Sequence, residues 1–209
     1  MSFHWRLAAN VFAAAVEDRC VFLDLRKDAY SSISLRSLDQ LGDDGKVALA
    51  LQRNGLVESV ETHGDARLAL TTWPNLIGAT GCRWASSLHA LGDLARAFRA
   101  GAWTSRMLRE PLLQTVEYVR RTPRGASLNG LAREVERFQG ARAWFPRDEL
   151  CLFDSLMLWR WLQHQRLGAN WVFGVRLRPF LAHCWLEQDG IALNEELEHV
   201  CRFTPILAI

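Results

Sequence analysis

The chain has 209 residues, 49% of them hydrophobic, and a net charge of only +2, so it can bury a real core and shows no overall polyanion-binding signature. Its five cysteines include no metal-like CxxC pair, which indicates a reducing, cytoplasmic setting. No apolar run reaches eighteen residues and no signal-peptide pattern opens the chain, so we expect neither a membrane span nor export.

The first sixty-two residues predict a small antiparallel sheet followed by short helices. Residues 19–25 and 29–34 are strand-like and are separated by a turn, and either 3–7 or 10–16 supplies a further strand. Helices are expected over 35–41 and 46–53. This order of elements resembles a winged helix.

A DNA-binding winged helix is the first alternative for this region. Its usual footprint is a basic recognition helix. The segment 46–53 carries only two cations, Lys46 and Arg53, among apolar residues. We therefore expect no nucleic-acid partner.

The middle of the chain predicts a linker and then helices. Clusters of Thr, Gly, Pro and Asn mark 63–84 as the linker. Helices are expected over 88–98, 107–119 and 128–138, the first two separated near Gly101. From residue 96 to 147, eleven arginines stand against four acids, which fits either solvated helix faces or a docking surface for an acidic peptide or a partner enzyme.

A cysteine at a helix start carries the first chemical signal. Pro146 suits the entry to a helix, Asp148 suits its N-cap, and Cys151 follows in the first turn. The positive end of the helix dipole lowers the pKa of a thiol placed there. The helix is apolar on nearly every face and is expected to run about twenty residues, to a C-cap at Gly168.

His183, on the predicted strand 181–187, is the candidate base for Cys151. His164 lies on the cysteine's own helix, roughly 20 Å further along the axis, and cannot reach the thiol. A histidine on a separate strand can be brought to the helix start by folding. The alternative for a lone cysteine is an inert core thiol.

The third member of the site is open between two residues. If Asp189 and Gly190 form a two-residue hairpin turn, strand parity puts Asn194 on the face of His183. A bulge or a three-residue loop would present Glu195 instead. We favour Glu195, because a carboxylate stabilises an imidazolium better than an amide does.

A zinc site and other cofactors are not expected. His183 and Cys184 could be combined with Cys151 or Cys201, but the paired short spacings of zinc ligands are absent. The chemistry of a cysteine with a histidine needs no metal and no cofactor.

The residues around this trio resemble the lasso-peptide maturation B proteins of the microcin J25 type. That family's pattern is a cysteine at a helix start, His-x-Trp-x-Glu, and an acid just after an Asn. This chain has Cys151, then His183 with Trp185 and Glu187, then Asn194 and Glu195. One family member carries Asp at the position of Glu195, a side chain one methylene shorter. The resemblance implies a transglutaminase-like cysteine protease that removes the leader from a ribosomally made precursor.

The resemblance also implies a domain order and partners. It makes 1–62 a PqqD-like leader-recognition domain, 63–84 a linker and 85–209 the protease domain of an α+β protein. The leader would add as a strand along Tyr30, Ser31, Ser32 and Ile33. Trp185 would lie at the substrate site, and an asparagine-synthetase-like lactam cyclase would receive the core peptide. A transglutaminase or other acyltransferase, and a leader-binding scaffold without activity, are the alternatives.

Overall fold

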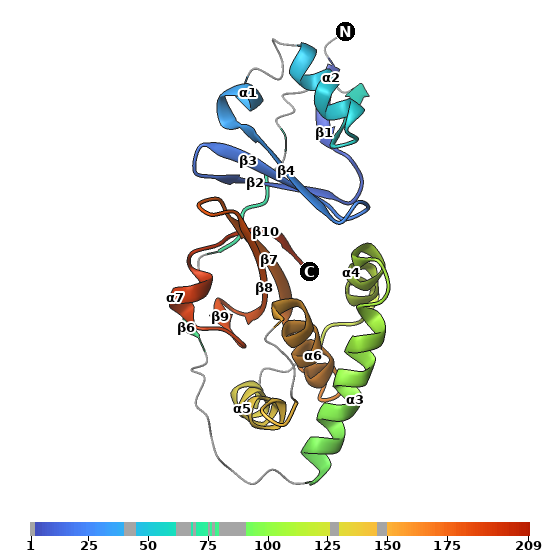
Figure 1. The fold of residues 1–209 in the computed structure, drawn as a ribbon, viewed down its shortest axis with the longest axis vertical. Helices are drawn as coiled ribbons and strands as arrows, with labels where there is room; N and C mark the ends of the chain where they lie inside the picture. Colours follow the sequence, from blue (N-terminus) through green and yellow to red (C-terminus); the bar gives the residue numbers. More distant parts are fainter. Residues whose placement is uncertain are drawn as a thin grey trace.

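A computed structural model describes residues 3–39, 45–61, 68, 70–74, 76, 78–79, 91–125, 130–145 and 150–209. The chain forms two stacked lobes, with the N-terminal sheet and its helices at the top of Figure 1 and a second sheet with larger helices below. This confirms the expected α+β fold.

The N-terminal lobe is built on a three-stranded antiparallel sheet. The sheet consists of β2 (Val11–Val16), β3 (Arg19–Asp24) and β4 (Ala29–Ser34) in that order, and it is followed by α1 (Leu35–Asp39) and α2 (Gly45–Arg53). β1 (Phe3–Leu7) pairs instead with β5 (Val57–Glu61). Of the two segments considered for the third strand, Val11–Val16 therefore supplies it.

The central strand of this sheet is buried on both faces. Because side chains alternate along a strand, Cys20 and Phe22 pack against the helices of the N-terminal lobe, and Val21 and Leu23 join the core of the lower lobe. Both Val21 and Leu23 are fully buried. The sheet thus lies between two hydrophobic cores, one within the N-terminal lobe and one shared with the lower lobe.

The lower lobe contains a five-stranded sheet with the order β10-β7-β8-β9-β6. Its strands are β6 (Gly78–Ala79), β7 (Asn170–Arg176), β8 (Leu181–Gln188), β9 (Ile191–Ala192) and β10 (Thr204–Ala208), with the short helix α7 (Leu197–Val200) before the last strand. β7 and β8 form its central antiparallel pair, in which Gly174 lies opposite His183.

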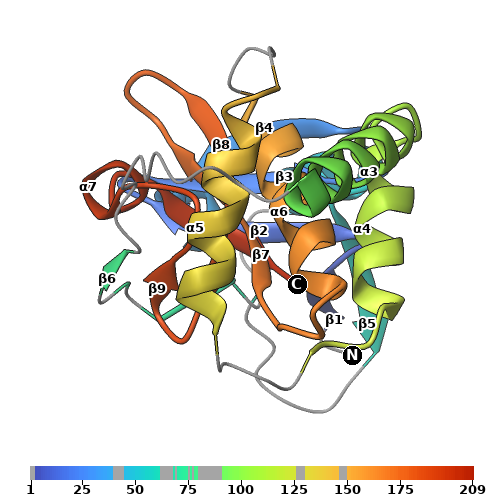
Figure 2. The ribbon, with the colours of Figure 1, turned by 90° about the horizontal axis from the view of Figure 1, so that it is seen from below.

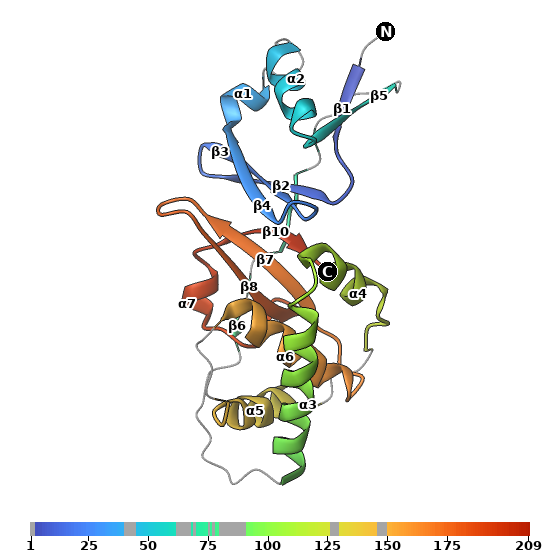
Figure 3. The ribbon, with the colours of Figure 1, turned by 45° about the vertical axis from the view of Figure 1, so that its right-hand side comes forward.

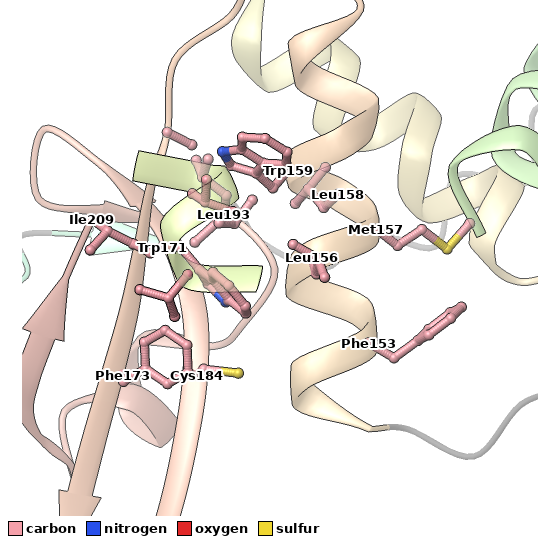
Figure 4. Packing of buried hydrophobic residues seen from close by; sticks show 14 of the residues in the cluster. Phe153, Leu156, Met157, Leu158, Trp159, Trp171, Phe173, Cys184, Leu193 and Ile209 are labelled. Atoms are coloured by element: carbon pink, nitrogen blue, oxygen red, sulfur yellow. The ribbon is translucent and has the colours of Figure 1, made fainter. Parts of the chain in front are cut away.

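The described part of the lower lobe also has four longer helices, of which α6 packs directly against the sheet. They are α3 (Leu91–Met107), α4 (Leu112–Arg121), α5 (Leu131–Arg142) and α6 (Cys151–Gln163). α6 packs against α3, α5 and the strand β8, as Figures 2 and 3 show from two sides. Its side chains are mostly buried, as the apolar sequence predicted, and several of them appear in Figure 4.

Several helix boundaries differ from the sequence predictions, those of α3 and α6 among them. α3 continues through Gly101, because a side chain there would stand 2.9 Å from the Phe145 ring and the glycine allows this close packing. α6 has 13 residues and not about twenty. The residue with positive φ after it is Arg166, at 57°, so the chain turns before Gly168 is reached.

Ion pairs neutralise part of the arginine-rich middle segment. Arg96 and Arg137 both pair with Glu134, and Arg137 also pairs with the buried Asp93. Arg142 pairs with Asp154 at 2.6 Å. These pairs give part of the arginine excess a structural role, and docking of a partner on the rest stays a prediction.

The described part of the stretch interpreted as a linker is tied to both lobes. The Thr71 N–H donates to the Ala13 carbonyl oxygen at 2.7 Å, and its hydroxyl donates to the Ile206 carbonyl oxygen at 2.8 Å. Trp73 donates its indole N–H to Glu187 at 2.5 Å. Among the described residues, no helix is both long and apolar enough to cross a membrane.

Candidate active site

Cys151 is the first residue of α6, so the thiol sits at the helix N-terminus. The N-cap is Leu150, which makes no side-chain capping hydrogen bond, and the expected cap Asp148 lies outside the described residues. The first helical bond runs from the Asp154 N–H to the Leu150 carbonyl oxygen. The N–H of Cys151 therefore precedes the helical ladder and, with the dipole, favours negative charge at this point.

His183 is carried by β8 and sits in an aromatic environment. Its ring lies 4.9 Å from the His199 ring and 5.1 Å from the Phe203 ring, centre to centre, and stacks on Trp185 at 6.2 Å. The imidazole side chain is only 12% exposed. These neighbours fix the ring plane and exclude most water from one side of it.

The structure brings Glu195, and not Asn194, to the histidine. Glu195 Oε1 lies 3.0 Å from His183 Nε2. The carboxylate is off the line of the ring N–H, so the contact is an ion pair and not a well-aligned hydrogen bond. Asn194 turns back to the sheet, where its Oδ1 accepts the Leu186 backbone N–H at 2.7 Å.

The hairpin itself explains how Glu195 arrives there. β8 and β9 do pair around a two-residue turn, with Gln188 opposite Ile191 and positive φ at Asp189 and Gly190. The expectation that this register excludes Glu195 was wrong, because the paired strand ends at Ala192 and the chain then bends. Strand parity holds only while the ladder continues.

The electrostatics favour a thiolate and an imidazolium. A hydrogen bond from the Cys184 thiol outweighs burial, and contact with His183 adds to it, so the pKa of Cys151 falls to about 4. Burial alone would lower the pKa of His183, but contacts with Cys151 and Glu195 prevail and raise it to about 9. With Nε2 turned to Glu195, Nδ1 is the ring nitrogen left for the thiol.

Residues 92–208 match the model of the transglutaminase-like superfamily, which is more than half of the chain. The chain belongs to this superfamily. No curated protein and no solved structure is detectably similar to it. The family fits a thiol enzyme of the cysteine protease or transglutaminase type, with the cysteine at a helix start and the histidine on a strand.

Two neighbours of this transglutaminase-like site were not expected from the sequence. Cys184 follows His183 directly, and its position on the opposite face of β8 could have been read from strand alternation. Its thiol contacts Cys151 and lies 3.4 Å from Ser155 Oγ. His199, on α7, has no sequence signal that links it to the site.

The donor set of this site includes possible metal ligands. The ligand atoms of His183, Glu195 and His199 lie within 4.8 Å of one another, and the types His and Glu suit zinc. Glu195 is already engaged with the imidazole at 3.0 Å. We therefore assign the contact between Glu195 and His183 to stabilisation of the imidazolium, because a buried ring needs a nearby negative charge to carry its own positive charge.

Trp185 and Tyr30 were both expected to contact the substrate, and the structure places them differently. Trp185 is 1% exposed and donates its indole N–H to the buried Glu187, so the expectation that it lines the substrate site was wrong. Tyr30, on β4, packs its ring 5.5 Å from Phe180, and burial is the main cause that raises the pKa of its hydroxyl. The N-terminal edge strand thus contacts the lower lobe at Phe180, between β7 and β8.

Exposed apolar side chains lie close in sequence to the residues of this transglutaminase-like site. A cavity of about 80 Å³ lies elsewhere, between α4, α6 and the C-terminal residue Ile209. Beside the site, Leu150, Phe180 and Leu181 are exposed apolar side chains.

Proposed function

We propose that the chain is a cysteine endopeptidase that removes the leader peptide from a lasso-type precursor. The observation that carries the proposal is the arrangement of Cys151, His183 and Glu195. A thiol whose pKa is about 4 stands in contact with an imidazole whose pKa is about 9, and a carboxylate lies 3.0 Å behind that imidazole. This is the charge distribution of an activated thiol nucleophile.

The chemistry follows from these three groups. The Cys151 thiolate attacks the scissile carbonyl carbon, and the carbonyl oxygen becomes an oxyanion that the Cys151 N–H at the helix start can receive. The His183 imidazolium gives its proton to the leaving amine, which releases one peptide. Water, deprotonated by His183, then hydrolyses the thioester. Glu195 holds the imidazolium throughout.

The leader would bind along the edge of β4. Within the described residues β4 pairs only with β3, so its other edge is open to an added strand. Backbone hydrogen bonds at such an edge give affinity, and neighbouring side chains give register. Tyr30 contacts Phe180, which directly precedes the strand of His183, so a peptide on this edge would lead toward that strand.

A lasso precursor is the proposed substrate because of the sequence pattern and this two-lobe arrangement. The freed core peptide would pass to an asparagine-synthetase-like cyclase that forms the macrolactam. The reaction proposed here consumes only the precursor and water, and uses no cofactor.

The test uses the precursor encoded beside the gene. We expect a short precursor gene and a cyclase gene there, and we expect the protein to cut that precursor once, between leader and core. Cys151→Ala should abolish cleavage while leader affinity stays unchanged, because alanine suits a helix start and removes only the thiol. Mass spectrometry of the products and fluorescence anisotropy with a labelled leader give the two readouts.

Each alternative has its own outcome in this test. Full cleavage by the Cys151→Ala variant would rule out the thiol mechanism. Transfer of the acyl group to an added amine, in preference to water, would indicate an acyltransferase. Leader binding with no cleavage by the wild type, with and without the cyclase, would indicate a recognition scaffold.

A further inference from the structure

Cys184 is the one described thiol beside the site that the proposed reaction does not need. It follows His183 on β8, and Figure 4 shows its sulfur on the side of the strand that faces α6. The side chain is 2% exposed and belongs to the common core. A buried cysteine in a core is usually an inert small hydrophobe. The contacts of Cys184 indicate a role beyond packing.

Two independent interactions place Cys184 within one helical turn of Cys151. Ser155, one turn along α6, donates its hydroxyl to the Cys151 carbonyl oxygen at 2.6 Å and lies 3.4 Å from the Cys184 sulfur. The two thiols also act on one another: Cys184 lowers the pKa of Cys151, and burial and then Cys151 raise the pKa of Cys184. Through Ser155, Cys184 therefore faces the first turn of α6, next to Cys151.

The two thiols differ in reactivity in the way a redox pair requires. Cys151 is half-buried and reaches the surface at the helix start, whereas Cys184 is enclosed. The negative charge on Cys151 is stabilised, and burial holds the pKa of Cys184 well above its usual value. An oxidant therefore reacts first with the Cys151 thiolate, and the protonated Cys184 thiol lies next to the oxidised sulfur.

We propose that Cys184 is a resolving cysteine, so that oxidation of Cys151 by peroxide ends in a reversible Cys151–Cys184 disulfide. In the first step the Cys151 thiolate attacks hydrogen peroxide, the O–O bond breaks, and a sulfenic acid and hydroxide form. In the second step the Cys184 sulfur attacks the Cys151 sulfur and the S–O bond breaks. The leaving hydroxide takes the Cys184 proton, which gives water and the disulfide.

The consequence is a nucleophile that is switched off but kept from irreversible oxidation. A sulfenic acid without a nearby thiol is oxidised further to sulfinic acid, which dithiols do not reduce. The inference rests on Cys151 being the reactive thiol of the proposed function. The experiment below measures peptide masses and needs no substrate. A missing crosslink would therefore count against the disulfide, and a missing protease activity would count against the proposed function.

The test exposes the purified full-length protein to hydrogen peroxide, removes the peroxide with catalase and maps the peptides. Trypsin alone leaves Cys184 and Cys201 in one peptide, because no Lys or Arg lies between them, so a glutamate-specific protease is added. We expect a crosslink between peptides 150–160 and 177–187, lighter by two hydrogen atoms. Dithiothreitol should remove the crosslink and restore the free Cys151 thiol.

Matched variants separate the resolving role from general thiol chemistry. In Cys184→Ala we expect Cys151 to gain two oxygen atoms, and the fraction of thiol recovered with dithiothreitol to fall at least about fivefold. Cys184→Ser repeats the measurement with a side chain of similar size, and circular dichroism verifies the fold of both. The exposed Cys201 is the control, and Cys201→Ala should behave as the wild type.

Two results would overturn the inference. One is a wild-type protein in which peroxide yields Cys151 sulfinic acid and no crosslink to peptide 177–187. The other is full recovery of the Cys151 thiol by dithiothreitol in both folded Cys184 variants.

Discussion

At the scale of single residues, the opposite pKa shifts of Cys151 and His183 set the pH range of activity. The thiolate forms above about pH 4, and the imidazolium is lost above about pH 9. The active ion pair therefore exists between these values. We expect kcat/KM to follow a bell-shaped curve with limbs near these two values, measured with a fluorogenic precursor peptide. A single limb between pH 6 and 7, typical of an unperturbed histidine, would contradict the ion pair.

Glu195 and Asn194 are neighbours in sequence with separate tasks. Glu195→Gln removes the charge 3.0 Å from Nε2, so we expect kcat to fall at least about 10-fold and the basic limb of the pH curve to move to lower pH. Asn194→Ala leaves the buried Leu186 N–H without its acceptor, which costs about 1–3 kcal/mol of stability. We expect it to affect the unfolding midpoint more than kcat. The reverse pattern would exchange the two roles.

At the scale of elements, Gly174 on β7 lies opposite His183 on β8, and the absence of a side chain there leaves room for the Trp185 ring. A side chain at Gly174 would stand 2.7 Å from the Trp185 ring and 3.0 Å from Phe203 Cβ. Trp185 cannot yield, because it is buried and its indole is bonded to Glu187. We expect Gly174→Ala to lower the free energy of unfolding by about 1–3 kcal/mol and to reduce activity with it, measured by urea denaturation and peptide cleavage.

A second glycine gives the matched control. Gly92, in the first turn of α3, has nothing within 4 Å of the added methyl group. Gly92→Ala should leave stability unchanged or raise it by up to about 1 kcal/mol, through helix propensity alone. Equal stability of the two variants would show that the space behind His183 is not restricted.

The elements differ in how far the sequence alone could predict them. Strand propensity located β3 and β4, and the long apolar run that begins at Cys151 located its helix, because local propensity and burial agree there. The continuation of α3 through Gly101 depends on the Phe145 ring, which is distant in sequence. The position of Glu195 depends on where the strand ladder ends, and no local pattern marks that point.

At the scale of the whole molecule, the N-terminal sheet serves two cores at once. Val21 and Leu23 face the lower lobe, and Cys20 and Phe22 face the N-terminal helices. A fragment ending near Glu61 would leave the first pair exposed to water, at a cost of several kcal/mol. Tests of leader recognition therefore require the full chain.

The last prediction concerns the edge where the leader would bind. Successive residues of a strand direct their N–H groups to opposite edges, so only one of Ser31 and Ser32 presents its N–H to the open edge of β4. Proline at that position removes a donor for an added strand and spares the pairing with β3. Proline at the other position breaks a bond to β3 and lowers stability instead.

We therefore expect one of the variants Ser31→Pro and Ser32→Pro to lose leader affinity and the other to lose stability. In a Cys151→Ala background, one variant should bind a labelled leader peptide at least about 10-fold more weakly at unchanged melting temperature, and the other should melt earlier. Ser31→Ala and Ser32→Ala are the matched controls and should keep leader affinity. Two folded proline variants with wild-type affinity would show that the leader binds away from β4, with the arginine-rich helices as the next surface to test.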